Sequence, residues 1–228
     1  MDKQEIVNAI TGYTGKLLRK RFGKGPEALG VFFDDRSIVL HLENFMSPIE
    51  EVLLAREDEK TFRYTRELMM KSLLPEIEIF FREELGFRPM NLFYDWNFQN
   101  SSGIIVGLVQ EEFEGQLAEE DYSGREDVHY QIIKVLTRSQ RKPSLIDSWW
   151  IDSETLLIFR RGLAILLEKE LNTLGYTDIL KTAKRKLEKG LLRDETSFGT
   201  IVGKPMSDLY IDWDFDRDDS IIVCRFKA

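Results

Sequence analysis

Hydrophobic residues recur at helical spacing at the start of the chain. Ile6, Ile10 and Leu17 lie on one face of a 3.6-residue helix, with polar residues between them. Gly23 follows the last of these turns. Because glycine readily adopts the left-handed conformation at a helix C-terminus, we expect the helix to end there.

The period then changes from helical to extended. Two β-rich runs, Leu29–Phe33 and Ser37–Glu43, flank an Asp-Asp-Arg turn and predict a β-hairpin. A second pair of runs, Met90–Phe98 and Ile104–Val109, predicts another hairpin closed over residues 99–103. Both hairpins favour antiparallel pairing, since their connections are short.

A helical segment lies between the two hairpins. Ser47 can cap its N-terminus, Pro48 suits the first helical position and Glu50 can close a capping box. Apolar residues continue at helical spacing for about 30 residues. Pro75 is expected to kink or divide this segment, and Gly86 to end it.

The sequence contains an internal repeat. Residues 92–98 read LFYDWNF, and residues 209–215, shifted by 117, read LYIDWDF. The same shift superposes 104–106 on 221–223, as well as Pro26 on Pro143. We therefore divide the chain into a first repeat, an acidic linker and a diverged second repeat, which span residues 1–113, 114–126 and 127–228.

The order of elements in each repeat is helix, hairpin, helices, hairpin. This order predicts an α+β fold in which helices cover one face of an antiparallel sheet. Two such repeats could bury their remaining surfaces against each other. We accordingly predict a pseudo-symmetric pair that resembles a homodimer.

Composition narrows the possible classes of protein. The formal net charge is −8, which favours solubility and argues against chain-wide attraction to nucleic acid or anionic lipid. No apolar run is long enough to cross a bilayer, and the first residues lack the apolar centre of a signal peptide. The single cysteine, Cys224, excludes an internal disulfide. The cytoplasm is the compartment that these observations favour.

The repeated Asp-Trp pair is the most distinctive polar feature of the sequence. In a strand, Trp96 and Trp213 would point to one face, and Asp95 and Asp212 to the other. One interpretation is structural, with tryptophan in the core and aspartate in an ion pair. The alternative is a ligand or partner pocket anchored by the aspartates. The structural interpretation is favoured, because both repeats share the motif and a pocket needs converging polar groups.

Basic residues cluster in two places. Each cluster can be a solvated helix face or a surface for an anionic partner, and the acidic balance favours the former. The first cluster ends the first helix, and the second lies in the long helical segment of the second repeat. Their members are Lys16, Arg19, Lys20, Arg21 and Lys24, then Lys181, Lys184, Arg185, Lys186 and Lys189.

No motif in the sequence predicts catalysis, a cofactor or a metal. The turn at 23–26 lacks the frame of a phosphate-binding loop. Residues 214–218 carry aspartates at alternate positions, but the glycine and glutamate of a calcium loop are missing. His41, His129 and Cys224 have no partner at ligand or catalytic spacing.

The first repeat resembles the bacterial MpsC-like family. The resemblance rests on the order of its motifs: a leading helix, Gly23–Pro26, the hairpin Val31–Leu42, Ser47–Glu50, Arg66 and the hairpin Leu92–Val109. The family takes its name from a membrane-potential-generating system. Its membrane partners resemble a proton-translocating NADH-dehydrogenase subunit and a carbonic-anhydrase-like protein, and they are linked to uptake of inorganic carbon.

The resemblance implies a non-enzymatic cytoplasmic accessory or regulatory protein that associates with such a transport system. The alternative is a regulator that binds a small ligand or nucleic acid through the basic first helix; an enzyme acting at the Asp-Trp strands is a weaker idea. At a shift of 117 the second repeat has Leu167 and Ala183 in place of Glu50 and Arg66. The candidate partner or ligand surface comprises Lys16, Arg19, Lys20, Lys24, Glu50, Arg66, Asp95, Trp96, Asp212 and Trp213.

Overall fold

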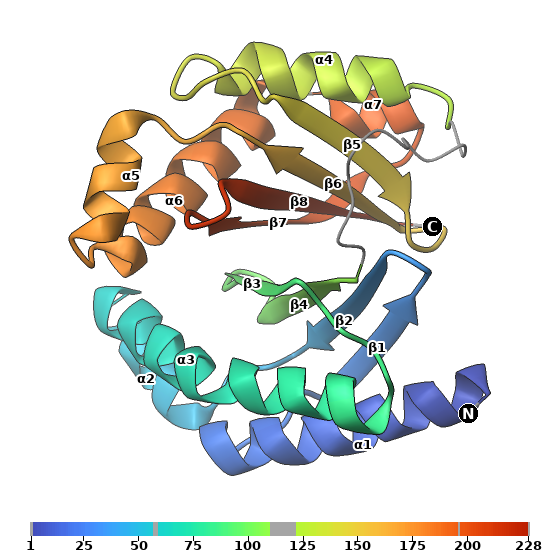
Figure 1. The fold of residues 1–228 in the computed structure, drawn as a ribbon. Helices are drawn as coiled ribbons and strands as arrows, with labels where there is room; N and C mark the ends of the chain where they lie inside the picture. Colours follow the sequence, from blue (N-terminus) through green and yellow to red (C-terminus); the bar gives the residue numbers. More distant parts are fainter. Residues whose placement is uncertain (1, 57–58, 110–121, 196, 228) are drawn as a thin grey trace. The chain divides into compact units, whose positions relative to one another are not determined.

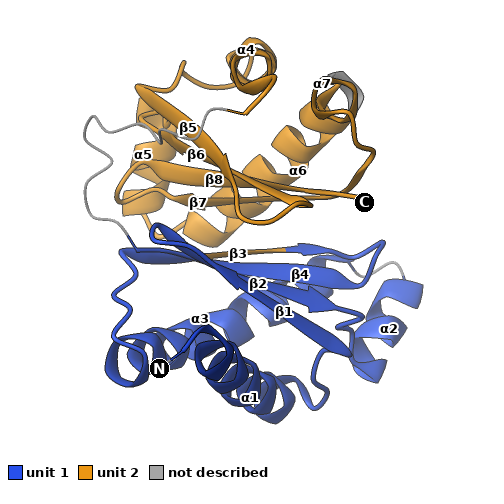
Figure 2. Cartoon of the chain, turned by 90° about the vertical axis from the view of Figure 1, so that its right-hand side faces the viewer, with its two compact units in different colours: residues 1–92, 96–111 blue, residues 93–95, 112–228 orange. Residues whose placement is uncertain are grey.

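The computed structural model describes residues 2–56, 59–109, 122–195 and 197–227. The chain divides into two compact units (Figure 2). The first comprises residues 1–92 and 96–111, and the second comprises residues 93–95 and 112–228. Most of the predicted linker, 114–126, lies outside the described residues.

The first unit contains one helix before its first hairpin and two between its hairpins, as the sequence predicts. Figure 1 shows α1 and α3 lying side by side on one face of its sheet. The elements are α1 (Lys3–Phe22), β1 (Ala28–Phe33), β2 (Ser37–Glu43), α2 (Pro48–Ala55), α3 (Glu59–Glu84), β3 (Asn91–Asn97) and β4 (Ser102–Leu108).

Local signals determine the ends of α1. The side chain of Asp2 accepts a hydrogen bond from the backbone N–H of Glu5, and the Glu5 carboxylate accepts one from the Asp2 N–H, which is a complete capping box. Gly23 ends the helix in the left-handed conformation at φ 74°, as predicted. The predicted apolar face is buried at Ile10 and Leu17.

The four strands of the first unit lie in the order β1-β2-β4-β3. β2 pairs antiparallel with both β1 and β4, so Leu40 has Val31 on one side and Ile105 on the other. This central strand is almost entirely buried, which explains its nearly continuous run of apolar residues.

The segment between the hairpins divides between Ala55 and Glu59 and not at Pro75. α2 ends at Ala55, and α3 then continues from Glu59 to Glu84 with Pro75 inside it. Pro75 therefore does not divide the helix. Leu73 and Ile77 are both buried on either side of it, so burial holds the two halves of α3 to the same face.

The second unit has the same strand order, β5-β6-β8-β7. Its core includes Trp213 and apolar residues from every helix except α5. α4 begins directly after Gly124, within the segment assigned to the linker. The elements are α4 (Arg125–Leu136), β5 (Leu145–Trp150), β6 (Thr155–Arg161), α5 (Leu166–Thr173), α6 (Thr177–Glu195), α7 (Phe198–Val202), β7 (Met206–Asp214) and β8 (Asp219–Phe226).

The fold class is thus α+β, with two four-stranded antiparallel sheets and helices packed on each. The matching strand order is the structural counterpart of the sequence repeat. Packing of the two repeats as a pseudo-symmetric pair stays a prediction.

Candidate functional site

A buried ion pair holds the N-terminus of α2. The Glu50 carboxylate accepts hydrogen bonds from the backbone N–H and the hydroxyl of Ser47 at 2.8 and 2.9 Å. It also binds Arg66 of α3 with both oxygens, at 2.6 and 3.0 Å. Arg66 donates a further hydrogen bond to the Phe45 carbonyl at 2.6 Å. Glu50 and Arg66 are only 3% and 2% exposed, so this bidentate pair ties α2 and α3 together inside the unit.

Aromatic rings surround the guanidinium of Arg66. Its central carbon lies 4.2 Å from the ring centre of Trp96 and 5.0 Å from those of Phe45 and Phe62. Phe22, at the end of α1, is 5.6 Å away. Cation–π contacts of this kind strengthen when the cation is removed from water. Trp96 is therefore one of the buried rings that surround Arg66, and it is not an exposed surface for a ligand.

Burial and pairing act in opposite directions on the two charges. Burial raises the pKa of Glu50, but the hydrogen bonds and charge of Arg66 outweigh it, and the pKa lies below its usual value. Burial lowers the pKa of Arg66, although Glu50 partly offsets this. Both groups stay ionised at neutral pH, because an arginine pKa remains far above 7.

Acid should weaken the first unit through Glu50. A carboxylate whose pKa is lowered by folding contributes stability above its unfolded pKa, and this contribution is lost as pH falls through the folded value. We expect the free energy of unfolding to stay level from pH 7 to about 5 and to fall below about 4.5. Urea unfolding at each pH measures this. The decline in the free energy of unfolding should be smaller in Glu50→Gln. An identical decline in this variant would contradict the role of Glu50.

The second unit contains an equivalent pair with different chemistry. The Glu168 carboxylate accepts from the N–H of Ile165 at 3.0 Å and pairs with Lys184 of α6 at 3.0 Å. Lys184 also donates to the side-chain oxygen of Gln140 at 2.6 Å and lies 4.1 Å from the ring centre of Trp213. Each unit thus holds its short helix through a buried carboxylate and a cation packed on tryptophan.

This equivalence corrects the pairing of Glu50 with Leu167 and of Arg66 with Ala183. The turn between β5 and β6 is one residue longer than that between β1 and β2, so the shift from β2 to α6 is 118 and not 117. Asp34 and Asp152 mark the change, because each caps its turn by accepting from the first residue of the next strand. The second repeat therefore keeps the acidic partner.

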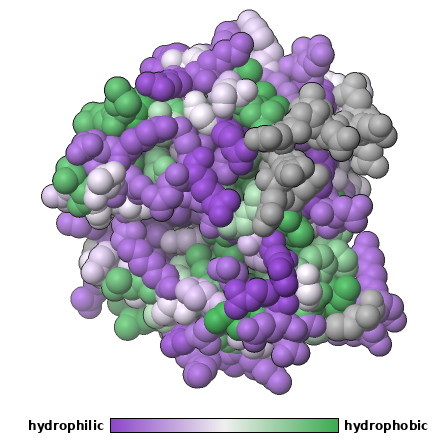
Figure 3. Space-filling view, in the orientation of Figure 1, coloured by the Kyte–Doolittle hydropathy of each residue, from purple (hydrophilic) through white to green (hydrophobic). Residues whose placement is uncertain are grey.

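Both short helices expose apolar side chains. Ile49 and Val52 of α2 are 71% and 51% exposed, and Leu166 and Leu167 of α5 are 73% and 65% exposed. Ile49 and Leu167 occupy equivalent positions. On the face shown in Figure 3, hydrophilic residues predominate and hydrophobic ones lie between them. One exposed apolar position thus recurs in the two units.

The aspartates of the Asp-Trp motifs bind backbone. Residues 93–95 of β3 group with the second unit, where the Tyr94 N–H donates to Asp212 at 2.9 Å and the Ile211 N–H donates to Asp95 at 2.7 Å. Lys189 pairs with Asp95 at 2.5 Å. Asp95 and Asp212 are 1% and 0% exposed. These contacts agree with the structural interpretation of the motif.

Asp212 is the most strongly paired of these carboxylates. Burial raises its pKa, yet Arg185 at 2.7 Å and Lys181 at 3.3 Å outweigh that effect and hold the pKa below its usual value. The neighbouring Trp213 donates from Nε1 to Glu188 at 2.9 Å. The basic residues of α6 are thereby largely neutralised, and only Lys186 of that cluster is exposed.

The ten predicted surface residues accordingly fall into two groups. Lys16, Arg19 and Lys20 are exposed on α1, and Lys24 is partly exposed in the turn that follows. The other six lie in the interior, which corrects their assignment to a surface: Glu50, Arg66, Asp95, Trp96, Asp212 and Trp213. They can affect a partner only by positioning other groups, and that role stays a prediction. Sequence reasoning missed the exposed Ile49 and Val52.

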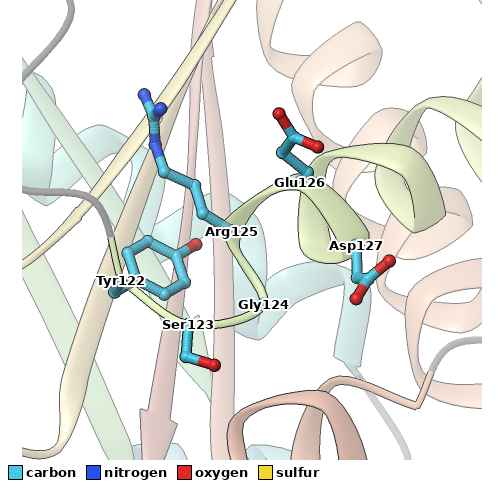
Figure 4. A pocket seen from close by; sticks show the side chains of 6 residues that line it. All are labelled: Tyr122, Ser123, Gly124, Arg125, Glu126 and Asp127. Atoms are coloured by element: carbon cyan, nitrogen blue, oxygen red, sulfur yellow. The ribbon is translucent and has the colours of Figure 1, made fainter.

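A cavity of about 360 Å³ lies at the start of α4, lined by residues 122–127 (Figure 4). Figure 4 shows Tyr122 and Arg125 on one side of the loop and the two acids of the first helical turn on the other. Arg125 pairs with Asp147 at 2.6 Å. The lining is polar and of mixed charge, so it does not favour one class of ligand.

Beside this cavity, His129 has a partner that its sequence context did not reveal. Its Nε2 lies 2.7 Å from the hydroxyl of Ser148, which also contacts the Tyr122 hydroxyl at 2.8 Å. Burial, followed by the charge of Arg125, lowers the pKa of His129 to about 4, so the ring is neutral at pH 7. Ser148 is 0% exposed, and a substrate cannot reach its hydroxyl.

Asp214 and Asp218 have structural partners, and Cys224 is buried. Asp214 accepts from the backbone of its own turn, and Asp218 accepts from the N–H groups of Leu163 and Ala164. Burial raises the pKa of Cys224 to about 12. Within the described ranges, no group of three or more histidine, cysteine, aspartate or glutamate residues could hold a metal ion.

Comparison with known proteins gives one match. Residues 2–111 match the family model described as "Na+-translocating membrane potential-generating system (MpsC)". The match covers the first repeat, so placing the second repeat in this family stays a prediction. No curated protein and no solved structure matches the chain. Among the described residues, no helix has the length and apolar character to span a membrane.

Proposed function

Because residues 2–111 match this family model, we propose that the protein is a cytoplasmic accessory or regulatory component of a membrane ion-transport system. The match is the observation that carries the proposal. In its finer form, the proposal includes association with membrane subunits, a link to uptake of inorganic carbon and the absence of a catalytic step of its own.

The short helix α2 is the surface that we assign to the partner. Ile49 and Val52 expose aliphatic side chains to water, and the buried pair of Glu50 and Arg66 holds the helix that presents them. A rigid helix loses little conformational entropy on binding, which favours its use as a docking element. The contact would be made by the apolar residues and not by the ion pair beneath them.

Affinity capture from gently solubilised membranes tests this proposal. The wild-type chain is expected to retain membrane transport subunits, identified by mass spectrometry. Ile49→Asp with Val52→Asp should lower their recovery at least tenfold, because burying a carboxylate in an apolar contact is costly. Ile79→Asp is the matched control, since Ile79 is 46% exposed but lies on α3.

Two outcomes would contradict the proposal. One is a wild-type chain that recovers no membrane transport subunit; equal recovery by the wild-type chain and the α2 double variant would contradict only the assignment to α2. The other is a deletion strain whose membrane potential, followed with a voltage-sensitive dye, and bicarbonate-dependent growth both match the parent strain. Loss of capture in the Ile79→Asp control as well would remove the assignment to α2.

A further inference from the structure

Beyond its first turn, the first helix lies in a segment without acidic residues. Residues 6–26 contain no aspartate or glutamate, although the chain has 40 of them, and they contain five lysines and arginines. Arg21 pairs with Glu76 of α3. The remaining four cations are Lys16, Arg19, Lys20 and Lys24, which we call the α1 basic cluster.

The α1 basic cluster projects from the C-terminal end of the helix. Lys16, Arg19 and Lys20 are spaced to share one face of the helix and are exposed. The Arg19 side chain reaches the backbone of the following turn, about 3.5 Å from where a Cβ of Gly25 would lie, and this places it near Lys24. Within the described part of the chain, no carboxylate forms an ion pair with these four side chains.

Apolar side chains lie close to this cluster. Phe22, which ends α1, packs on Phe45 with ring centres 5.0 Å apart, and α2 begins three residues after Phe45. The N–H of Glu27 also bonds the carbonyl of Glu43 at 2.9 Å. These contacts bring the C-terminal end of α1 close to the segment that leads into α2.

The second unit carries a similar feature. Residues 128–146 contain no acid, and Lys134, Arg141 and Lys142 are exposed at the end of α4 and in the turn beyond it. A favourable interaction with the helix dipole accounts for one cation at a helix C-terminus. It does not require four, nor the absence of acids from all of residues 6–26.

We propose that the α1 basic cluster docks on the anionic surface of a membrane, and this inference rests on the proposed function. Phosphate and carboxylate headgroups complement the cations, each of which contributes roughly fivefold in affinity near such a surface. Nucleic acid offers the same charge but no apolar layer beside it. A membrane subunit bound through Ile49 and Val52 would bring the bilayer next to this unit, which favours a lipid surface.

Vesicle co-sedimentation of the full chain tests the inference. The probe is a phosphatidylcholine vesicle with about one third phosphatidylserine, compared with phosphatidylcholine alone. The protein should bind only the anionic vesicles, and binding should weaken with salt. Changing Lys16, Arg19 and Lys20 to Gln should lower the partition coefficient roughly 100-fold.

A matched control changes charge elsewhere on the same unit. Replacing Lys60, Lys71 and Arg82 with Gln on α3 also lowers the net charge by three and should alter the partition coefficient no more than about twofold.

Three results would overturn the inference: no binding of the wild-type chain to anionic vesicles, equal losses in the two charge variants, or tight DNA binding that depends on α1 without vesicle binding. The vesicles contain no protein. Vesicle binding without capture of transport subunits would contradict the accessory role alone, and capture without vesicle binding would contradict the lipid surface alone.

Discussion

Replacing Arg66 with alanine is expected to lower the free energy of unfolding by about 3–5 kcal/mol. The substitution leaves the Glu50 carboxylate buried at 3% exposure without its counter-ion, and it also empties the space between the rings of Trp96 and Phe62. Urea unfolding at pH 7, followed by tryptophan fluorescence, measures the effect. Trp96 packs on the guanidinium and should report the change directly.

An exposed pair on the same helix provides the control. Arg63 pairs with Glu59 at the surface, so Arg63→Ala should cost at most about 0.5 kcal/mol. Replacing both buried charges, with Glu50→Leu and Arg66→Met, should recover much of the loss, because no unpaired charge then remains. Equal effects of Arg63→Ala and Arg66→Ala would show that the buried pair is not a source of stability.

Removing Glu188 should destabilise the second unit by a similar amount. Its carboxylate binds Arg160 at 2.9 Å, Lys184 at 3.5 Å and the Trp213 indole at 2.9 Å. Arg160 is 0% exposed, and Glu188 is the one acidic residue with which it pairs among the described residues. Glu188→Ala leaves that charge uncompensated, and we expect a loss of about 3–5 kcal/mol.

Thermal unfolding of Glu188→Ala and of Lys186→Ala separates this effect from a loss of helix stability. Lys186 is on the same helix but exposed, so its replacement should change the free energy of unfolding by less than about 0.5 kcal/mol. Adding Arg160→Leu to Glu188→Leu should restore part of the stability. A variant at Glu188 that unfolds with the wild-type transition would contradict the role of this carboxylate.

Features governed by neighbouring residues could be predicted from the sequence. The capping box at Ser47 and Glu50, the left-handed Gly23 and both hairpins of the first unit depend on residues only a few positions apart. Their chemistry is the same in any fold. The apolar face of α1 also follows from spacing, because a helix must bury one side.

Features that depend on distant contacts could not be predicted in this way. Pairing of Glu168 with Lys184 is hidden by a single extra residue, Ile151, in the turn before β6. That insertion shifts the alignment of the two repeats by one residue. At the uncorrected shift of 117, Leu167 and Ala183 therefore align with Glu50 and Arg66. The positions of the turn-capping aspartates reveal the insertion once the hairpins are known.

In the candidate site, too, local features could be predicted and distant contacts could not. The order of the motifs drew attention to Glu50 and Arg66, but spacing does not reveal that both side chains point inward. One signal was available in the sequence. Glu50 is at the third position of a capping box, and if it also pairs with a distant cation such as Arg66, the side of α2 that carries it must be buried. Ile49 and Val52 then lie outward, and they form the exposed part of the helix.

The two versions of the buried pair bear on how the repeats diverged after duplication. Phe22 packs on Arg66 in the first unit, whereas Gln140, which the shift of 117 pairs with Gly23, binds Lys184 in the second. A guanidinium suits an aromatic neighbour, whereas an ammonium requires an acceptor. A lysine at the position of Arg66, without a new acceptor, would leave a buried ammonium donor without a hydrogen bond. An arginine at the position of Lys184, without an aromatic neighbour, would be packed less well. The two changes are therefore epistatic, and an intermediate sequence with only one of them would have been less stable than either present-day repeat.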